Sequence, residues 1–191
     1  MGIHPQLPNA ITVARIPLAV VFFVLLIVGG PFGDDSGAVR WVAAVLFVFA
    51  ISTDWIDGYL ARRYEIVSDF GKLWDPIADK LLTGAAFVGL AVLGEVAWWM
   101  VIVILVREWG ITVHRLRVRR AHDVSAAWMG KVKTAFQGVA LSWALIPFDV
   151  LIPRDIWTTV TAVLMWIVVI LTVASGVDYV AAQMRGARAA R

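Results

Sequence analysis

The chain has 191 residues, of which 61% are hydrophobic and only 16% are charged, and its net charge is +3. Soluble domains are usually about 45–50% apolar and about 25% charged, so this composition indicates a membrane protein. The chain contains no cysteine, which excludes disulfides, iron–sulfur clusters and zinc sites built on thiolates.

Hydrophobic runs separated by turn residues predict six membrane-spanning helices. In chain order we expect them at about residues 9–30, 39–63, 75–94, 96–116, 132–151 and 155–184. Only helices and closed barrels satisfy backbone polar groups in lipid, and these runs are far longer than barrel strands of about 10 residues. The predicted fold is therefore an all-α integral membrane bundle of six transmembrane helices, forming a single domain over residues 1–191.

The basic residues predict the orientation of this bundle. Those on one side are Arg62, Arg63, Lys72, Arg115, Arg117, Arg119, Arg120, Lys131, Lys133, Arg185, Arg188 and Arg191, whereas the other side has only Arg40 and Arg154. The positive-inside rule then places both termini in the cytoplasm and predicts a protein of the cytoplasmic (inner) membrane. A positive membrane face suits anionic headgroups or an anionic substrate, so we expect no nucleic-acid partner.

Residues 54–80, "DWIDGYLARRYEIVSDFGKLWDPIADK", hold six of the chain's 14 acidic residues between two apolar runs. Asp54 and Asp57 are three residues apart, which places them about 60° apart around one helix. Asp75 and Asp79 are four residues apart, about 40° apart on the next helix. If the faces of these neighbouring helices meet, four carboxylates converge near the cytoplasmic end of the bundle.

Such a cluster needs compensation, because each aspartate inside a membrane costs at least about 2.5–3.5 kcal/mol. Either several of the four are protonated or cations are bound. The stretch has no histidine, so its ligands are all oxygen, which suits hard ions such as Mg²⁺, Mn²⁺ or Ca²⁺. Two divalent ions would balance four carboxylates, and such pairs are used for displacement at phosphorus.

Structural explanations for single aspartates remain open. Asp75 precedes Pro76, the pattern of a helix N-cap followed by proline at the first helical position. Asp79 could form a plain ion pair with a nearby basic side chain, and Asp57 could mark a kink at the glycine that follows it. Asp54 lies deep in an apolar run and is the hardest of the four to explain in this way.

Small residues beside the carboxylates leave room for a ligand. Gly58 follows Asp57 and lets a ligand approach the helix backbone, and Ala61 keeps the same face low. Arg62 then lies near the membrane surface, where it can meet a phosphate. Small residues, an arginine and two metal ions together describe a pocket for a nucleotide diphosphate.

The pattern Asp54-x2-Asp57-Gly58-x2-Ala61-Arg62-x8-Gly71-x3-Asp75-x3-Asp79 resembles, at every position, the signature of the CDP-alcohol phosphotransferases. The resemblance implies transfer of a phosphatidyl or similar group from a CDP-linked donor to an alcohol, with release of CMP. It implies that the four aspartates hold two Mg²⁺ or Mn²⁺ ions and that Asp79 is the general base. Gly58, Ala61, Arg62 and Gly71 would line the CDP site, and family analogy suggests a homodimer.

Two further segments, "LPNAITVARIPLA" (7–19) and "GKVKTAFQ" (130–137), resemble the phosphatidylglycerophosphate synthase branch of that family. The implied substrates are CDP-diacylglycerol and glycerol 3-phosphate, whose phosphate needs cationic partners. The candidates are Arg107, Arg115, Lys131 and Lys133; Arg107 and Arg115 share a helix face, and the two lysines open the next predicted helix. For Arg107, an ion pair with the neighbouring Glu108 or an aspartate is an alternative.

Other functions stay open on the sequence alone. Relatives of the same chemistry use inositol phosphate or phosphatidylglycerol as acceptor, and inositol phosphate would need the same cationic pocket. A cation or proton transporter could also use intramembrane carboxylates. A transporter, however, predicts acidic residues near the midplane on several helices, whereas here they cluster on two.

Overall fold

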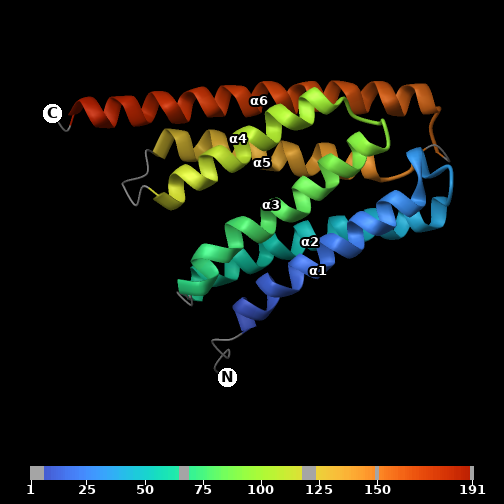
Figure 1. Cartoon of the computed structure of the whole chain (residues 1–191), viewed down its shortest axis with the longest axis horizontal. Helices are drawn as coiled ribbons and strands as arrows, with labels where there is room; N and C mark the ends of the chain where they lie inside the picture. Colours follow the sequence, from blue (N-terminus) through green and yellow to red (C-terminus); the bar gives the residue numbers. More distant parts are fainter. Residues whose placement is uncertain (1–6, 65–68, 118–123, 149–150, 190–191) are drawn as a thin grey trace.

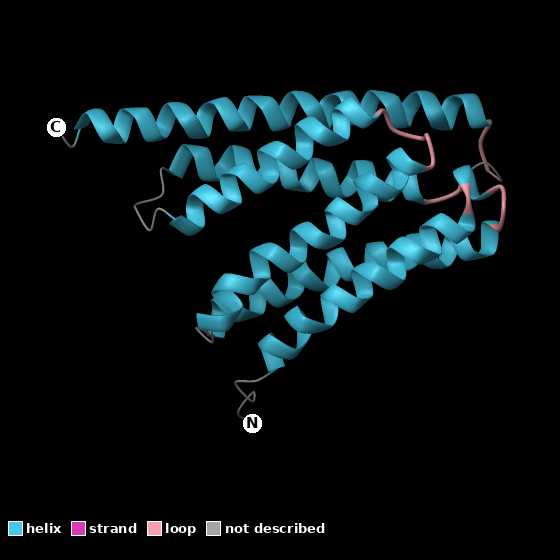
Figure 2. Cartoon of the chain, viewed as in Figure 1, coloured by secondary structure: helices cyan, strands magenta, loops and turns pink. Residues whose placement is uncertain are grey.

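The computed structural model describes the backbone of residues 7–64, 69–117, 124–148 and 151–189, and side chains in 14–53, 77, 80–114, 128–148 and 151–185. All the regular elements of the described chain are helices, and it contains no strand (Figure 2). Its elements are α1 (Leu7–Gly29), the 3₁₀ helix η1 (Pro31–Gly33), α2 (Gly37–Tyr64), α3 (Asp69–Val92), α4 (Trp98–Arg117), α5 (Val124–Leu145) and α6 (Arg154–Ala189). The prediction of six helices in an all-α fold is confirmed for this part of the chain.

Two of the helices begin earlier than the hydrophobic runs predict. α3 begins at Asp69 rather than at Asp75, so Asp75 lies inside the helix. α5 begins at Val124 rather than at about residue 132. The N-cap explanation for Asp75 is therefore wrong, and helix capping does not account for the aspartate at this position.

The helices run up and down between two ends of the bundle (Figure 1). The turns between α1 and α2, between α3 and α4, and between α5 and α6 lie at one end (Figure 2). The first turn of α1 and the last turns of α2, α4 and α6 lie at the other end of the bundle. At that end, helices α1–α3 spread apart from helices α4–α6. All the segments that carry the predicted cytoplasmic charges therefore adjoin the same end.

Small residues let the helices pack closely. α1 packs against both α2 and α3, and α5 packs against α6. Ala43, Ala44, Ala86 and Ala140 are buried in the core of the bundle, together with larger residues such as Phe22 of α1 and Phe47 of α2, whose rings lie 5.3 Å apart. Helix association in lipid relies on such close packing because lipid chains are as apolar as leucine.

The end of the bundle that holds the short turns is joined by a buried ion pair. Arg40 is fully buried and donates to both carboxylate oxygens of Glu95, at 2.8 and 2.7 Å. It also donates to the backbone carbonyls of Leu145 (3.0 Å), Ala144 (3.1 Å) and Gly30 (3.4 Å). One guanidinium thus connects α2, the α3–α4 turn, the end of α5 and the α1–α2 turn.

Many of the described side chains on the outside of the bundle are apolar. Among the described residues, one helix is long and apolar enough to cross a membrane, at Arg154–Arg185, and shorter apolar helices lie at Ala14–Gly29, Gly37–Thr53 and Lys80–Val92. Large aliphatic side chains are exposed along these helices, including Val24, Val45 and Ile170. Large exposed apolar areas mark contact with lipid or with another protein.

Candidate active site

The four motif aspartates lie on two helices that follow each other in the chain. Asp54 and Asp57 belong to α2, and Asp75 and Asp79 belong to α3. The intervening segment 65–68 is only four residues long, so the end of α2 and the start of α3 must be close. At a rise of about 1.5 Å per residue, Asp57 and Asp75 lie ~10 Å and ~9 Å from those ends, and Asp54 and Asp79 each lie ~15 Å from them.

The aspartates therefore form two levels along the helices. Asp57 and Asp75 share the level nearer the end, and Asp54 and Asp79 share the deeper one. The side chains of the four aspartates are outside the described part of the structure, as are those of Ala61, Arg62 and Arg115 and the surroundings of Gly58 and Gly71. Among the side chains that are described, no group of three or more histidines or carboxylates could hold a metal ion. The metal, CDP and base roles thus remain predictions.

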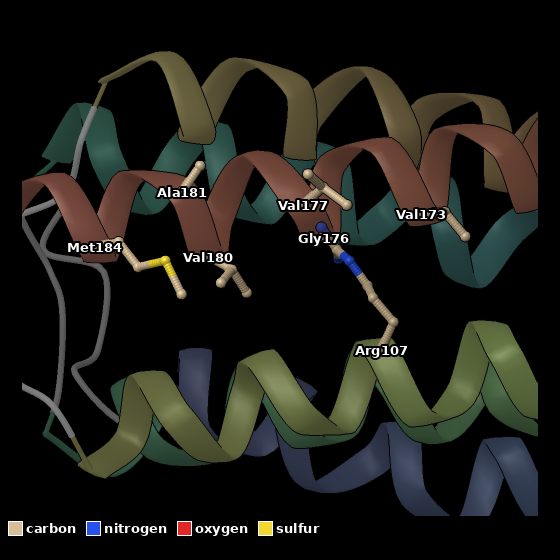
Figure 3. Close-up of a pocket in the computed structure, with 7 residues that line it drawn as sticks. All are labelled: Arg107, Val173, Gly176, Val177, Val180, Ala181 and Met184. Carbon is tan, nitrogen blue, oxygen red and sulfur yellow. The ribbon is translucent and has the colours of Figure 1, made fainter.

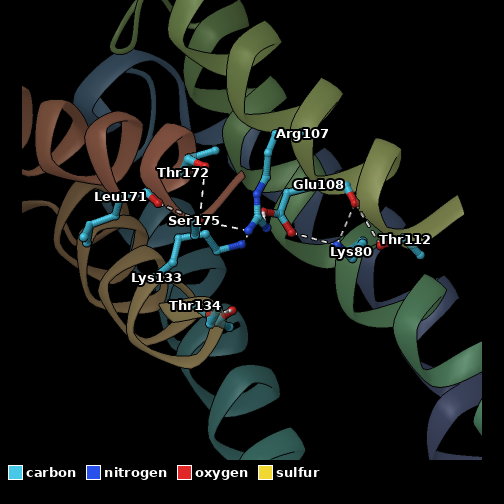
Figure 4. A network of polar contacts seen from close by, with 10 residues as sticks. Lys80, Arg107, Glu108, Thr112, Lys133, Thr134, Leu171, Thr172 and Ser175 are labelled. Atoms are coloured by element: carbon cyan, nitrogen blue, oxygen red, sulfur yellow. Dashed lines mark hydrogen bonds and ion pairs between the residues drawn. The ribbon is translucent and has the colours of Figure 1, made fainter. Parts of the chain in front are cut away.

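A network of charged side chains begins one residue after Asp79 (Figure 4). Lys80 of α3 donates from Nζ to Oε2 of Glu108, at 2.7 Å, and to the Glu108 backbone carbonyl, at 3.0 Å. Arg107 donates from Nη1 to Oε1 of Glu108 at 3.0 Å, and Lys133 of α5 donates to the same oxygen. We call Lys80, Arg107, Glu108 and Lys133 the Glu108 cluster.

The Glu108 cluster has an excess of positive charge. Three cationic side chains share one carboxylate, and all of them are largely shielded from solvent, with side chains between 3% and 17% exposed. Ion pairs shielded in this way are screened less by salt than surface pairs. The surplus charge makes the region suitable for an anion.

Arg107 is held on its other side by α6. Its Nη2 donates to the Ser175 hydroxyl at 2.8 Å, and that hydroxyl donates to the backbone carbonyl of Leu171 at 2.6 Å. Arg107 also packs beside Gly176 of α6, where a Cβ would be in van der Waals contact with Cγ of Arg107, at 3.4 Å. Nε of Arg107 is buried and has no hydrogen-bond partner among the described residues.

Beside Arg107, a groove of about 490 Å³ runs along α6 (Figure 3). Its lining is otherwise apolar or small: Val173, Gly176, Val177, Val180, Ala181 and Met184. Arg107 reaches from α4 toward Gly176 of α6, and Val180 and Met184 extend from α6 on the side that faces α4. Arg107 therefore borders the apolar groove and is also hydrogen-bonded to Glu108.

The sequence predictions for the acceptor side are partly corrected. Lys131 and Lys133 do not open a helix, because α5 begins at Val124. Lys133 is only 2% exposed and lies in an ion pair with Glu108, whereas Lys131 is exposed. The alternative explanation for Arg107, pairing with Glu108, is confirmed by the 3.0 Å contact, although it does not exclude a second role.

Two members of the cluster were missed by the sequence analysis as site candidates. Lys80 directly follows Asp79. Glu108 directly follows Arg107 and is the single acidic residue of α4. Charged residues inside membrane helices are rare and usually functional. The position of Lys80 and Glu108 within apolar runs of the sequence could therefore have indicated that they belong to the site.

Comparisons with known proteins agree with the motif. The family profile described as CDP-alcohol phosphatidyltransferase matches residues 5–174. A "Probable phosphatidylglycerophosphate synthase" of Mycobacterium tuberculosis (strain ATCC 25618 / H37Rv) is 42% identical over 180 residues, 94% of this chain and 82% of the relative. A "CDP-diacylglycerol--glycerol-3-phosphate 3-phosphatidyltransferase" of Bacillus subtilis (strain 168) is 40% identical over 91% of this chain and 93% of the relative.

An Escherichia coli (strain K12) protein with that same name is 32% identical over 190 residues, which cover 93% of each chain. These relatives match this chain over almost its whole length, and the family profile includes the motif and the Glu108 cluster. The chain belongs to the CDP-alcohol phosphatidyltransferase family.

Proposed function

We propose that this enzyme transfers the phosphatidyl group of CDP-diacylglycerol to glycerol 3-phosphate, giving phosphatidylglycerophosphate and CMP. The names of the similar proteins from B. subtilis and E. coli support this pair of substrates. The observation that carries the proposal is the two-level placement of four aspartates beside a cluster with surplus positive charge. Membership of a transferase family argues against the transporter alternative.

Asp54, Asp57, Asp75 and Asp79 are proposed to hold two divalent cations, Mg²⁺ or Mn²⁺. The fit rests on an all-oxygen donor set and on the matched depths of the two pairs along α2 and α3. Bound there, the two ions would neutralise charge on the diphosphate and on the attacking and leaving oxygens.

The reaction is a displacement at the phosphorus that carries diacylglycerol. The acceptor hydroxyl oxygen forms a new bond to that phosphorus, the bond to the CMP oxygen breaks, and Asp79 receives the hydroxyl proton as general base. Gly58, Ala61, Arg62 and Gly71 are proposed to line the CDP site. The absence of side chains at the glycines would allow the diphosphate to approach the helix backbone.

The phosphate of the acceptor is proposed to bind at Arg107 and Lys133, with Arg115 and Lys131 nearer the end of the bundle. Arg107 and Lys133 belong to a cluster that adjoins Asp79 through Lys80. A dianionic phosphate would offset the surplus positive charge of that cluster. Charge-assisted contacts of this kind are the strong ones in phosphate recognition.

We further propose one domain over residues 1–191 that crosses the cytoplasmic membrane six times, with both termini and the active site at the cytoplasmic face. The alternating connections and the positive charges adjoining one end support this orientation. A lipid-linked donor would then enter from the bilayer and a polar acceptor from the cytoplasm. A homodimer is proposed by family analogy alone.

The test is an acceptor panel. Purified protein with Mg²⁺ and CDP-diacylglycerol is given glycerol 3-phosphate, inositol phosphate or phosphatidylglycerol separately, and CMP release is measured. We expect CMP with glycerol 3-phosphate. CMP with inositol phosphate alone would refute the choice of acceptor, and no CMP with any of the three would refute the proposed function.

A further inference from the structure

Glu108 lies at the junction of four helices and has more cationic neighbours than its charge can balance. Its two carboxylate oxygens accept hydrogen bonds from Lys80 of α3, Arg107 of α4 and Lys133 of α5 (Figure 4). Arg107 extends the network to α6 through Ser175. The carboxyl group is thus the common acceptor that places three cations around one point.

The three cations depend on Glu108 to different degrees. Lys80 has a second acceptor in the Glu108 backbone carbonyl, and Arg107 has a second acceptor in the Ser175 hydroxyl. Lys133 is 2% exposed, and among the described residues its ammonium group contacts only the Glu108 carboxylate. Removal of the carboxylate charge would therefore disturb Lys133 most, because a buried cation without a partner is strongly unfavourable.

We propose that Glu108 is a positioning residue for the phosphate group of the acceptor. It holds Arg107 and Lys133 at a fixed separation, and through Lys80 it ties that pair to the helix segment that carries Asp79. The inference rests on the proposed function and adds to it a residue that touches no substrate. Glu108 preorganises the phosphate site, because Arg107 and Lys133 are already held in place and do not have to be ordered when the acceptor binds.

Two substitutions of Glu108, by glutamine and by aspartate, change the charge and the hydrogen-bond acceptors of this side chain in different ways. Glutamine keeps the shape of Glu108 but replaces one acceptor oxygen by an NH₂ group, which cannot accept a hydrogen bond from a lysine or arginine. One cation must then face a donor. Aspartate keeps the charge and both acceptors on a side chain one methylene shorter, so Glu108→Asp should retain part of the arrangement.

The experiment measures initial rates of CMP release against acceptor concentration at saturating CDP-diacylglycerol. For Glu108→Gln we expect the KM for glycerol 3-phosphate to rise roughly 10-fold or more, the effect of losing one charge-assisted contact. The KM for CDP-diacylglycerol should stay within about twofold, and Glu108→Asp should recover part of the loss. A purely structural role would lower the active fraction and leave both KM values unchanged.

Glu95→Gln is the matched control, since it also neutralises a buried carboxylate that pairs with an arginine. Glu95 precedes α4, and Glu108 lies about 15 Å further along that helix, so the Glu95 variant should leave both KM values unchanged even if less protein is folded. A second comparison uses Lys133→Met with and without Glu108→Gln. If Glu108 acts through Lys133, the double variant should have the acceptor KM of Lys133→Met alone.

The outcomes separate this inference from the proposed function. An active wild-type enzyme whose acceptor KM is unchanged in Glu108→Gln would overturn the role of Glu108 alone. If Glu108→Gln does not fold, Glu108→Asp decides: an acceptor KM equal to that of the wild type would overturn the inference. A wild-type enzyme that releases no CMP with any acceptor would overturn both.

Discussion

Replacing Glu95 by glutamine removes the charge that balances Arg40 at the end of the bundle that holds the short turns. Arg40 is fully buried, and the Glu95 side chain is 2% exposed. Glutamine can still accept hydrogen bonds at Oε1, where Arg40 Nη1 and the Phe32 amide now donate at 2.8 and 3.0 Å. Its NH₂ group, however, would face Nη2 of Arg40, which now lies 2.7 Å from Oε2.

The expected cost follows from this geometry. One partner of a buried ion pair is removed and the other charge stays buried, a change that usually costs about 3–5 kcal/mol. The backbone carbonyls of Leu145, Ala144 and Gly30 continue to accept from the guanidinium, so the lower half of that range is expected. Since proteins are typically stable by about 5–15 kcal/mol, the loss is a large fraction of the total.

The assay is equilibrium unfolding in mixed detergent micelles, followed by tryptophan fluorescence. Asp34→Asn serves as the comparison, because Asp34 pairs with Arg154 at the same end of the bundle but both side chains are exposed, 51% and 44%. Asp34→Asn should change stability little, as is usual for exposed pairs. If Glu95→Gln lowers the free energy of unfolding by less than about 1 kcal/mol, or no more than Asp34→Asn does, the reasoning about the buried pair is wrong.

Three further results are expected. Lys133→Ala should raise the KM for glycerol 3-phosphate roughly 10-fold or more with little change for CDP-diacylglycerol, and an unchanged acceptor KM in steady-state assays would count against its phosphate role. Removal of divalent cations by a chelator should abolish CMP release and added Mg²⁺ should restore it; turnover that persists in the chelator would contradict the metal proposal. Gly89→Val should lower the free energy of unfolding by about 1–3 kcal/mol, because a Cβ at this position would lie 2.5 Å from Cδ2 of the buried Leu26, and denaturation that matches the wild type would contradict the α1–α3 packing.

The number and order of the helices could be predicted because long apolar runs separated by turns are a direct property of the sequence. Their starting points could not. Pro76 suggested a helix start, yet α3 begins seven residues earlier at Asp69, and α5 extends through a less apolar stretch from Val124. Hydropathy detects the lipid-facing part of a helix rather than its ends, which explains both differences.

The candidate site was predictable only where its residues are close in sequence. The spacing of Asp54, Asp57, Asp75 and Asp79 indicates two helix faces, because each pair lies within about one helical turn. The Glu108 cluster instead joins residues 28 and 25 positions apart, Lys80 to Glu108 and Glu108 to Lys133. Nothing in local periodicity indicates which lysine reaches which carboxylate, so those pairings needed the packed helices.

The most direct measurement of the central claim is product identification by mass spectrometry with wild-type protein and Asp79→Asn. Each is incubated with CDP-diacylglycerol, glycerol 3-phosphate and Mg²⁺. We predict phosphatidylglycerophosphate and CMP in equal amounts from the wild type, and a rate lower by roughly 10²-fold or more from a folded Asp79→Asn variant, since positioned bases contribute about 10²–10⁴-fold. Wild-type protein that forms no phosphatidylglycerophosphate, or an Asp79→Asn variant that forms it at the wild-type rate, would contradict the account.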